Sequence, residues 1–478
     1  MSPLCIALIL CAYVGLLMAV AWRAAGRGDN STYFAGGHNQ NVWTVTLGRI
    51  SASMSGVTFV SVPGMVLHQD FTYLQMALGF VAGQMVIALV LVPLYYRLRV
   101  VSVYEYLEER FGLSARRSGA WLFFVSKLLG CAVRLMLVCV VLQAVMWDAW
   151  GVPFAVNVAV TVGVTWLYTL RGGVGSVVWT DVVKTFVLLG VVATVAVLVA
   201  NDGGESLWGA IAESVRGKRI LDRDWNSPTY CLKHFVAGAL SVVAMTGLDQ
   251  DMMQRTLSCR TERDARNNVI VSGVLQLGVI AMLLTLGAMM MRWAQTRGVA
   301  LPEAGDELFP AVAVGGGLSV VAGVMFVLGL AASSFSSAGS SLTALTTSFT
   351  LDILGGKTRF AESLTRVRRG VHTAMAVVVG VIIVAIHGAG TMSAIDVVFR
   401  LAAYTYGPLL GLFAFGILTR RKPNPRVLPV LAVVAPVLSF VVAVVAPRLL
   451  GGYRFGHDIL LVNATFMFVG LAFFSQKK

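Results

Sequence analysis

The stretch SASMSGVTFVSVPG, residues 51–64, places serines, a glycine and a Pro-Gly pair inside an apolar segment long enough to cross a membrane. A membrane-spanning helix can unwind at such a place only where its freed carbonyl groups meet water, other protein groups or a cation. The stretch therefore predicts a broken helix that lines a cavity. A weaker interruption in TGLDQD, residues 246–251, predicts a second broken helix.

The composition of the whole chain is that of a membrane protein. Of its 478 residues, 57% are hydrophobic and only 13% are charged, whereas an average soluble domain is about 25% charged. The net charge of +14 could suit nucleic acid, but the basic residues are spread over short loops between apolar segments. This is the pattern of the positive-inside rule, so we expect a lipid bilayer and no nucleic acid as partner. Six cysteines without paired spacing indicate neither a disulfide framework nor a zinc site.

Apolar stretches of about 20 residues predict an all-α integral membrane protein with about thirteen transmembrane helices. The distribution of arginine and lysine over the loops predicts an N-terminus outside and a cytoplasmic C-terminus. We expect the membrane to be the inner (plasma) membrane of a bacterium. The first segment lacks a cleavage site and is expected to remain as a helix. The predicted helices cover residues 3–22, 43–67, 72–96, 118–147, 152–170, 177–200, 232–254, 267–291, 317–347, 371–388, 392–418, 427–447 and 457–474.

The two interruptions lie in the first helices of two blocks of five spans, as an inverted repeat would place them. This arrangement predicts how the chain is divided. We expect a peripheral N-terminal helix and loop at 1–42, a first inverted repeat at 43–200, an extracytoplasmic loop at 201–231, a second inverted repeat at 232–418, and two peripheral C-terminal helices at 419–478.

Hydroxyl side chains crowd the ninth span, in LAASSFSSAGSSLTAL, residues 330–345. Small residues of this kind allow helices to pack closely, with hydroxyls bonded back to their own backbone. Alternatively, their oxygens could face the break at 51–64 and replace the water shell of a hard monovalent cation. The density of adjacent hydroxyls favours the cation site.

A few charged side chains fall inside the predicted spans, where an ionised group costs about 2.5–3.5 kcal/mol and is expected to face protein or water. Asp396 and Arg400 share a helix face and are expected to pair. Arg49 and Lys127 lie close enough to span ends to reach the membrane surface. Arg134 lies well inside the fourth span. It either clamps a substrate carboxylate in a cavity or pairs with a carbonyl or carboxylate elsewhere in the bundle.

Six motifs, taken in order, give the chain a family resemblance over nearly its whole length. It resembles the sodium/solute symporter family, whose members include sugar, proline, pantothenate and sialic acid transporters and share the leucine-transporter fold. The resemblance implies a five-plus-five inverted-repeat core with broken first and sixth core helices. The motifs are SASMSGVTFVSVPG (51–64), SVYEYLEERFG (102–112), RGGVGSVVWTDVVK (171–184), DQDMMQR (249–255), AASSFSSAGSS (331–341) leading to FTLD (349–352), and YGPLLGLF (406–413).

The resemblance also implies where the coupling ion binds. The family's principal sodium site, carried over residue by residue, uses the main-chain carbonyls of Ser51, Met54 and Ser333 with the hydroxyls of Ser336 and Ser337. This set agrees with the pairing of a broken helix and a serine-rich helix.

Some members hold a second sodium, which would use Asp181 and Ser340 here. Gly339 stands where that site would want another hydroxyl, which puts the second sodium in doubt. Lys184, one turn from Asp181, could also pair with its carboxylate, which would then not be available to bind sodium.

Substrate in this family lies near the membrane midplane beside the first break. An arginine in members that carry sialic acid is similar in placement to Arg134, which implies a carboxylated solute such as a sugar acid of the sialic or muramic acid type. The side chains expected at the substrate site are those of Ser53, Ser55, Thr58, Gln84, Arg134, Asp249, Gln250 and Tyr404.

The resemblance implies a sodium-coupled secondary active symporter that imports a small organic solute by alternating access. Sodium is the expected coupling ion, and no organic cofactor is expected. The alternatives are uptake of a neutral sugar or amino acid, and a solute sensor or channel on the same fold. An enzyme is not expected, because the histidines are scattered and the sequence has no HExxH, GxSxG or Walker motif. The expected partners are solute, sodium and bilayer, and no oligomer is implied.

Overall fold

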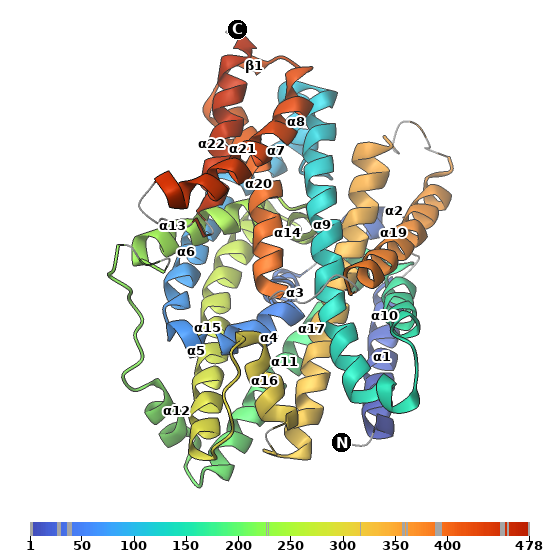
Figure 1. Ribbon diagram of the computed structural model, residues 1–478. Coiled ribbons are helices and arrows are strands. Elements are labelled where there is room, and N and C mark those ends of the chain that lie inside the picture. The colour runs from blue at the N-terminus through green and yellow to red at the C-terminus, as the bar shows by residue number, and fades with distance from the viewer. Residues whose placement is uncertain are drawn as a thin grey trace.

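The computed structural model describes residues 3–25, 30–35, 41–225, 227, 229–315, 317–355, 359, 362–387, 394–449, 455–456 and 458–476. These residues form a bundle of helices in which α1 begins at one end and α22 finishes at the other (Figure 1). For residues 394–401 only the backbone is described, so the predicted ion pair of Asp396 and Arg400 lies outside the described residues.

Regular structure is almost entirely helical. The α-helices are α1 Pro3–Ala25, α2 Asn30–Ala35, α3 Val42–Ser53, α4 Gly56–Gly64, α5 Val66–Gln69, α6 Tyr73–Val86, α7 Val92–Leu98, α8 Glu105–Phe111, α9 Leu113–Leu142, α10 Phe154–Thr169, α11 Val174–Asp202, α12 Leu207–Val215, α13 Cys231–Val242, α14 Gln250–Thr256, α15 Glu262–Thr296, α16 Leu308–Pro310, α17 Val320–Ser348, α19 Leu364–His387, α20 Ala394–Leu418, α21 Val427–Leu449 and α22 Ile459–Phe473. Short π-helical or 3₁₀ turns are η2 Ile87–Leu91, η3 Gln143–Trp147, η4 Asp148–Trp150, η5 Val243–Gly247, η6 Gly305–Glu307, η7 Ala311–Gly315 and η8 Phe349–Ile353. Two short antiparallel strands, β1 Lys422–Pro423 and β2 Ser475–Gln476, pair near the end of the chain.

The predicted spans correspond one by one to helices of the described chain. Eight described segments are long and apolar enough to cross a membrane, and two more spans are pairs of helices bent by 60° and 73° at a short break. Three shorter apolar helices are α10, α22 and the Ala402–Leu418 part of α20. The predicted all-α membrane bundle is therefore confirmed.

The first break separates α3 from α4 at Met54 and Ser55. The Met54 N–H donates to the carbonyls of Ile50 and Ser51, which closes the last turn of α3. The Ser55 hydroxyl accepts from the Thr58 N–H at 3.3 Å and caps α4. A serine at this position satisfies an amide that the new helix leaves free, so the sequence starts a second helix in a new direction.

The second break follows the same principle with a carboxylate. Asp249 has extended backbone between η5 and α14, and its side chain accepts from the Met252 N–H at 3.2 Å. Both helix interruptions predicted from the sequence are thus present, and each is capped by a polar residue that also faces the interior.

The serine-rich helix α17 contacts α4, α9 and α11 and runs beside α9 along the bundle (Figure 1). Small residues allow this close packing. A Cβ atom on Gly56 would lie 2.2 Å from the Ser334 hydroxyl, and one on Gly339 would lie 1.8 Å from the Tyr168 hydroxyl. Tyr168 reaches so close because its hydroxyl donates to the Phe335 carbonyl at 2.5 Å. Glycine at 339 is therefore explained by packing against α10.

Candidate functional site

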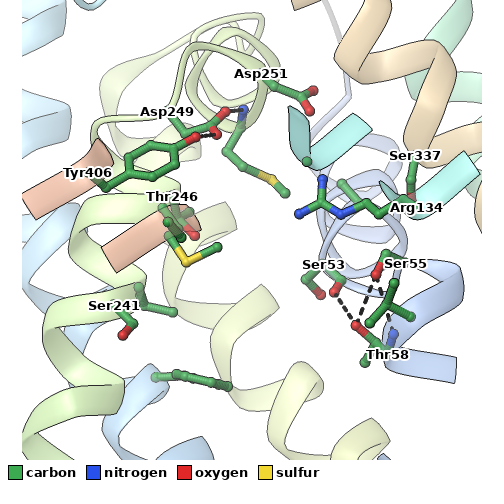
Figure 2. A pocket seen from close by; sticks show the side chains of 18 of the residues that line it. Ser53, Ser55, Thr58, Arg134, Ser241, Thr246, Asp249, Asp251, Ser337 and Tyr406 are labelled. Carbon is green, nitrogen blue, oxygen red and sulfur yellow. Dashed lines mark hydrogen bonds between the residues drawn. The ribbon is translucent and has the colours of Figure 1, made fainter. Parts of the chain in front are cut away.

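A cavity of about 150 Å³ is lined by residues of both breaks (Figure 2). Helices α6, α9, α15, α17 and α20 complete its wall. Its polar lining includes Ser53, Ser55, Thr58, Ser126, Lys127, Arg134, Ser241, Thr246, Asp249, Asp251, Gln276, Ser337, Ser340 and Tyr406.

Hydroxyl groups of the first break form one side of this cavity. The hydroxyls of Ser55 and Thr58 lie 3.3 Å apart, and Thr58 also donates to the Ser53 carbonyl at 3.5 Å. The Ser53 hydroxyl donates to the Ile50 carbonyl at 2.7 Å. This side of the cavity offers neutral donors and acceptors.

An ion cluster forms the opposite side, at the second break. The Lys127 ammonium lies 3.1 Å from the carboxylate of Asp249 and 2.7 Å from that of Asp251, and the Tyr406 hydroxyl donates to Asp249. The expectation that Lys127 reaches the membrane surface is wrong, because its side chain is 5% exposed and is held by two carboxylates. The cluster joins α9, α14 and α20 across the cavity.

Arg134 lies between these two groups without an ionic partner. Figure 2 shows its guanidinium pointing into the cavity between Asp249 and Ser53. Within the described part of the chain it forms neither a hydrogen bond nor a salt bridge, and its Nε is buried without a partner. A guanidinium has five donors in a planar fork that matches a carboxylate. An unpaired one in a cavity is therefore a ready site for an anion.

The structure brings five of the eight predicted substrate residues to this cavity: Ser53, Ser55, Thr58, Arg134 and Asp249. The other three have partners elsewhere. Gln250 donates to the Val101 carbonyl at 3.1 Å and accepts from the Val103 N–H at 2.9 Å, while the Tyr404 ring makes an edge-on contact with that of Phe440.

The Gln84 side chain is hydrogen-bonded to a buried arginine. Its side-chain carbonyl accepts from Arg49 at 2.9 Å, and Arg49 also donates to the hydroxyls of Ser272 and Thr256. The expectation that Arg49 reaches the membrane surface is wrong, because it is 4% exposed and its partners lie inside the bundle.

The predicted principal sodium ligands meet around a lysine. The Lys184 ammonium, on α11, lies 2.5 Å from the Ser51 carbonyl and 3.3 Å from the Ser337 hydroxyl. These two oxygens therefore converge on one point, as a cation site requires, but a side-chain cation stands at that point. Sodium does not fit there together with Lys184.

Of the other predicted sodium ligands, the Ser336 hydroxyl donates to the Asp181 carboxylate. Ser333, whose main-chain carbonyl is the predicted ligand, lies on α17. Met54 lies at the end of α3.

The predicted second sodium position is also beside a cation. Asp181 forms a salt bridge of 3.2 Å with Arg255, and Arg255 binds Asp251 at 2.7 Å. Ser340 donates to Asp251 at 3.3 Å. Among the described residues Lys184 forms no salt bridge with Asp181, so the pair that the sequence suggested is replaced by one with Arg255.

Sequence reasoning did not place Lys127 and Asp251 in this site, or Arg255 beside it as a partner of Asp251. A signal for them was present, because two carboxylates in one span, Asp249 and Asp251, require cations in the bundle. Hydropathy places Arg255 just past a span, whereas the tilt of α14 at the break turns it into the core, where it is 1% exposed.

Known proteins with similar sequences are cotransporters. The human sodium/iodide cotransporter is 29% identical over 272 residues, which are 56% of this chain and 42% of that protein. The mouse sodium-coupled monocarboxylate transporter 1 is 25% identical over 429 residues, which are 86% of this chain and 67% of that protein. The chain thus spans less than half of the human relative and about two thirds of the mouse one.

A solved structure of a Na+-coupled sialic acid symporter, in a substrate-bound outward-open state, superposes on 99% of each chain with a TM-score of 0.79 at 19% identity. The leucine-transporter-like fold with its two broken helices is thereby confirmed. The model of the sodium:solute symporter family matches residues 33–425, which include both breaks, α17 and the whole cavity. The chain therefore belongs to the sodium:solute symporter family.

Proposed function

We propose that this chain is a sodium-coupled symporter that imports a small organic anion, such as a carboxylic acid, by alternating access. The observation that carries the proposal is the unpaired guanidinium of Arg134 inside the cavity. A bidentate carboxylate would supply the missing partner and leave the hydroxyls of Ser53, Ser55 and Thr58 for the rest of the solute.

The names of the relatives support an anion. One is named for iodide and one for monocarboxylates, and the similar structure is that of a sialic acid symporter. All three are anions at neutral pH. Sodium is the coupling ion that family membership favours. Uptake would be driven by the sodium gradient together with the membrane potential, and the potential contributes about 2.3 kcal/mol per charge per 100 mV.

The ion cluster connects the helices that form one wall of the cavity. Lys127 and Tyr406 both bind Asp249, so α9 and α20 are held to the start of α14. An anion that binds Arg134 would meet this wall on one side and the first break on the other. Closing the cavity then requires the two broken helices to move relative to each other, as in transporters with inverted repeats.

The test is a melting-temperature screen of the purified protein in sodium and in potassium. The probes are pyruvate, iodide and sialic acid, with glucose and proline as neutral solutes. A ligand at 100 times its Kd stabilises the native state by about 2.7 kcal/mol, so binding is readily detected. We expect the anionic probes to raise the melting temperature and the neutral solutes to leave it unchanged. Arg134→Gln should abolish the rise.

Arg448→Gln is the matched control, because Arg448 is exposed at the end of α21, away from the cavity. It should leave the response to anions unchanged. Equal stabilisation by glucose or proline, or an anion response that survives Arg134→Gln, would contradict the proposal.

We also propose the orientation with the N-terminus outside and the C-terminus in the cytoplasm of a bacterial inner membrane. Its support is the basic loop between α20 and α21, with Arg420, Arg421 and Lys422, at the end of the bundle opposite the start of α1. A C-terminal green fluorescent protein fusion should fluoresce, and a C-terminal alkaline phosphatase fusion should be inactive. The reverse pattern would contradict this orientation.

A further inference from the structure

Lys184 stands where two of the predicted sodium ligands converge. Its ammonium is fully buried and contacts the Ser51 carbonyl at 2.5 Å and the Ser337 hydroxyl at 3.3 Å. We propose that this ammonium and a sodium ion exclude each other from the position, so that sodium binds there only after Lys184 has withdrawn. The inference deepens the proposed function and rests on it for the identity of the ion.

The Ser51 carbonyl is open to a cation because α3 ends two residues later. In a continuous helix this carbonyl would accept from the N–H four residues on, at Ser55. Ser55 instead begins the next helix as its cap, and the described donors to the Ser51 carbonyl are the Met54 N–H and Lys184. The break therefore creates the acceptor, and Lys184 uses it.

The partners of Lys184 are neutral oxygens, which distinguishes it from Lys127, the other buried lysine among the described residues. Lys127 and Arg255 each bind carboxylates. Lys184 forms no salt bridge within the described ranges of the chain, and the nearby Asp181 is held by Arg255 and Ser336. Buried lysines are ordinarily paired with a carboxylate. A set of carbonyl and hydroxyl oxygens is instead what a monovalent metal cation takes.

Two further oxygens near the break have no partner. The hydroxyls of Ser51 and Ser334 are both fully buried and form no hydrogen bond within the described structure. Ser334 lies one turn before Ser337 on α17 and directly against Gly56. Unsatisfied buried hydroxyls are costly, and their presence here fits a region that also receives an ion.

Mutual exclusion follows from charge and space. An ammonium and a sodium ion carry the same charge, and at one shared pair of oxygens each would lie within a few ångströms of the other in a region of low dielectric constant. The side chain is tethered, so it competes with sodium at a fixed high local concentration. Removing its charge should therefore strengthen sodium binding at least tenfold.

The test is sodium binding by the purified full-length protein, measured with ²²Na and as the sodium dependence of the melting temperature at constant ionic strength with potassium. Lys184→Met removes the charge and keeps the length of the chain. Lys184→Arg keeps the charge, and Lys422→Met, at an exposed residue of β1, is the matched control. Lys184→Gln replaces Lys184→Met if the methionine variant does not fold.

We expect Lys184→Met to lower the sodium concentration for half-maximal binding at least tenfold, with Lys184→Arg and Lys422→Met like the wild type. Adding Ser337→Ala to Lys184→Met should remove the gain in sodium affinity. This result would show that the additional sodium binds at the position between Ser51 and Ser337. A folded neutral variant that binds sodium no more tightly than the wild type overturns the proposal. If anion binding needs no sodium in the wild type while Lys184→Met gains sodium binding, the proposal holds and the sodium coupling of the proposed function fails.

Discussion

Asp181 on α11 and Arg255 on α14 form a salt bridge of 3.2 Å across 74 residues of sequence, and both side chains are buried. Arg255 also binds Asp251 at 2.7 Å. One guanidinium thus compensates two carboxylates on different helices, which fixes the short helix α14 to the body of the bundle.

Replacing Arg255 should therefore destabilise the protein strongly. Arg255→Gln leaves Asp181 and Asp251 buried with less compensation, and breaking a buried pair in this way costs about 3–5 kcal/mol. The measurement is the melting temperature of the purified protein. Asp181→Asn combined with Arg255→Gln should recover part of the loss, and a single variant as stable as the wild type would show that the pair carries little energy.

Gly339 should not tolerate a side chain. Gly339→Ala puts a Cβ atom 1.8 Å from the Tyr168 hydroxyl, so the helices must separate or the tyrosine must move. Overpacking of this kind costs about 1–3 kcal/mol, measured as a lower melting temperature. Tyr168→Phe in the same chain removes the clashing oxygen and should restore part of the stability. A stable Gly339→Ala protein would indicate that α10 and α17 adjust freely.

Tyr406→Phe should weaken the wall of the cavity. The Tyr406 hydroxyl donates to Asp249, and a hydrogen bond to a charged group contributes about 1.5–3 kcal/mol. We expect a lower melting temperature and a retained stabilisation by anions, because Arg134 is unchanged. Loss of the anion response in Tyr406→Phe would instead place this hydroxyl in contact with the solute.

The loop between α12 and α13 should lose stability in acid. Burial alone would raise the pKa of Asp222, but hydrogen bonds from Ser227, Thr229 and the Asp224 N–H, with Arg219 nearby, hold it below its ordinary value. The stabilisation is thus fully present above the pKa of an unfolded aspartate, about 3.9, and is lost as pH falls through the lower folded pKa.

Hydrogen exchange of the amides around Asp222 reports this effect. Asp222→Asn should open the loop at neutral pH, and the difference from the wild type should shrink as pH falls below about 4. A difference that is the same at every pH would show that the charge of Asp222 does not hold the loop.

The spans and both breaks could be predicted from the sequence because they depend on local composition. Apolar length gives the crossings, and the serines and glycine of 51–64 give the first break. The pairing of buried charges could not be predicted, since it depends on how each helix is rotated about its axis. Lys184 lies one turn from Asp181, yet it turns toward Ser51, and Asp181 binds Arg255 from another helix.

Five of the predicted substrate residues line the cavity because they lie on the two breaks or on the inner face of α9. The other three predicted residues lie outside the cavity lining for a related reason. Gln250 follows Asp249 directly, but successive residues at the start of a helix point in different directions, and Gln250 turns to the loop at Val101. Spacing identifies the segment that reaches a site, whereas the direction of each side chain follows from the bend at the break.

The break at Met54 and Ser55 also has an electrostatic consequence. The carbonyl end of α3, which carries the negative end of its dipole, lies at Ser51 and faces the Lys184 ammonium. The amide end of α4, with its positive end, begins at Gly56, and the neighbouring Ser55 and Thr58 line the cavity. A single interruption therefore presents two opposite poles, the carbonyl end of α3 toward the Lys184 ammonium and the amide end of α4 toward the cavity.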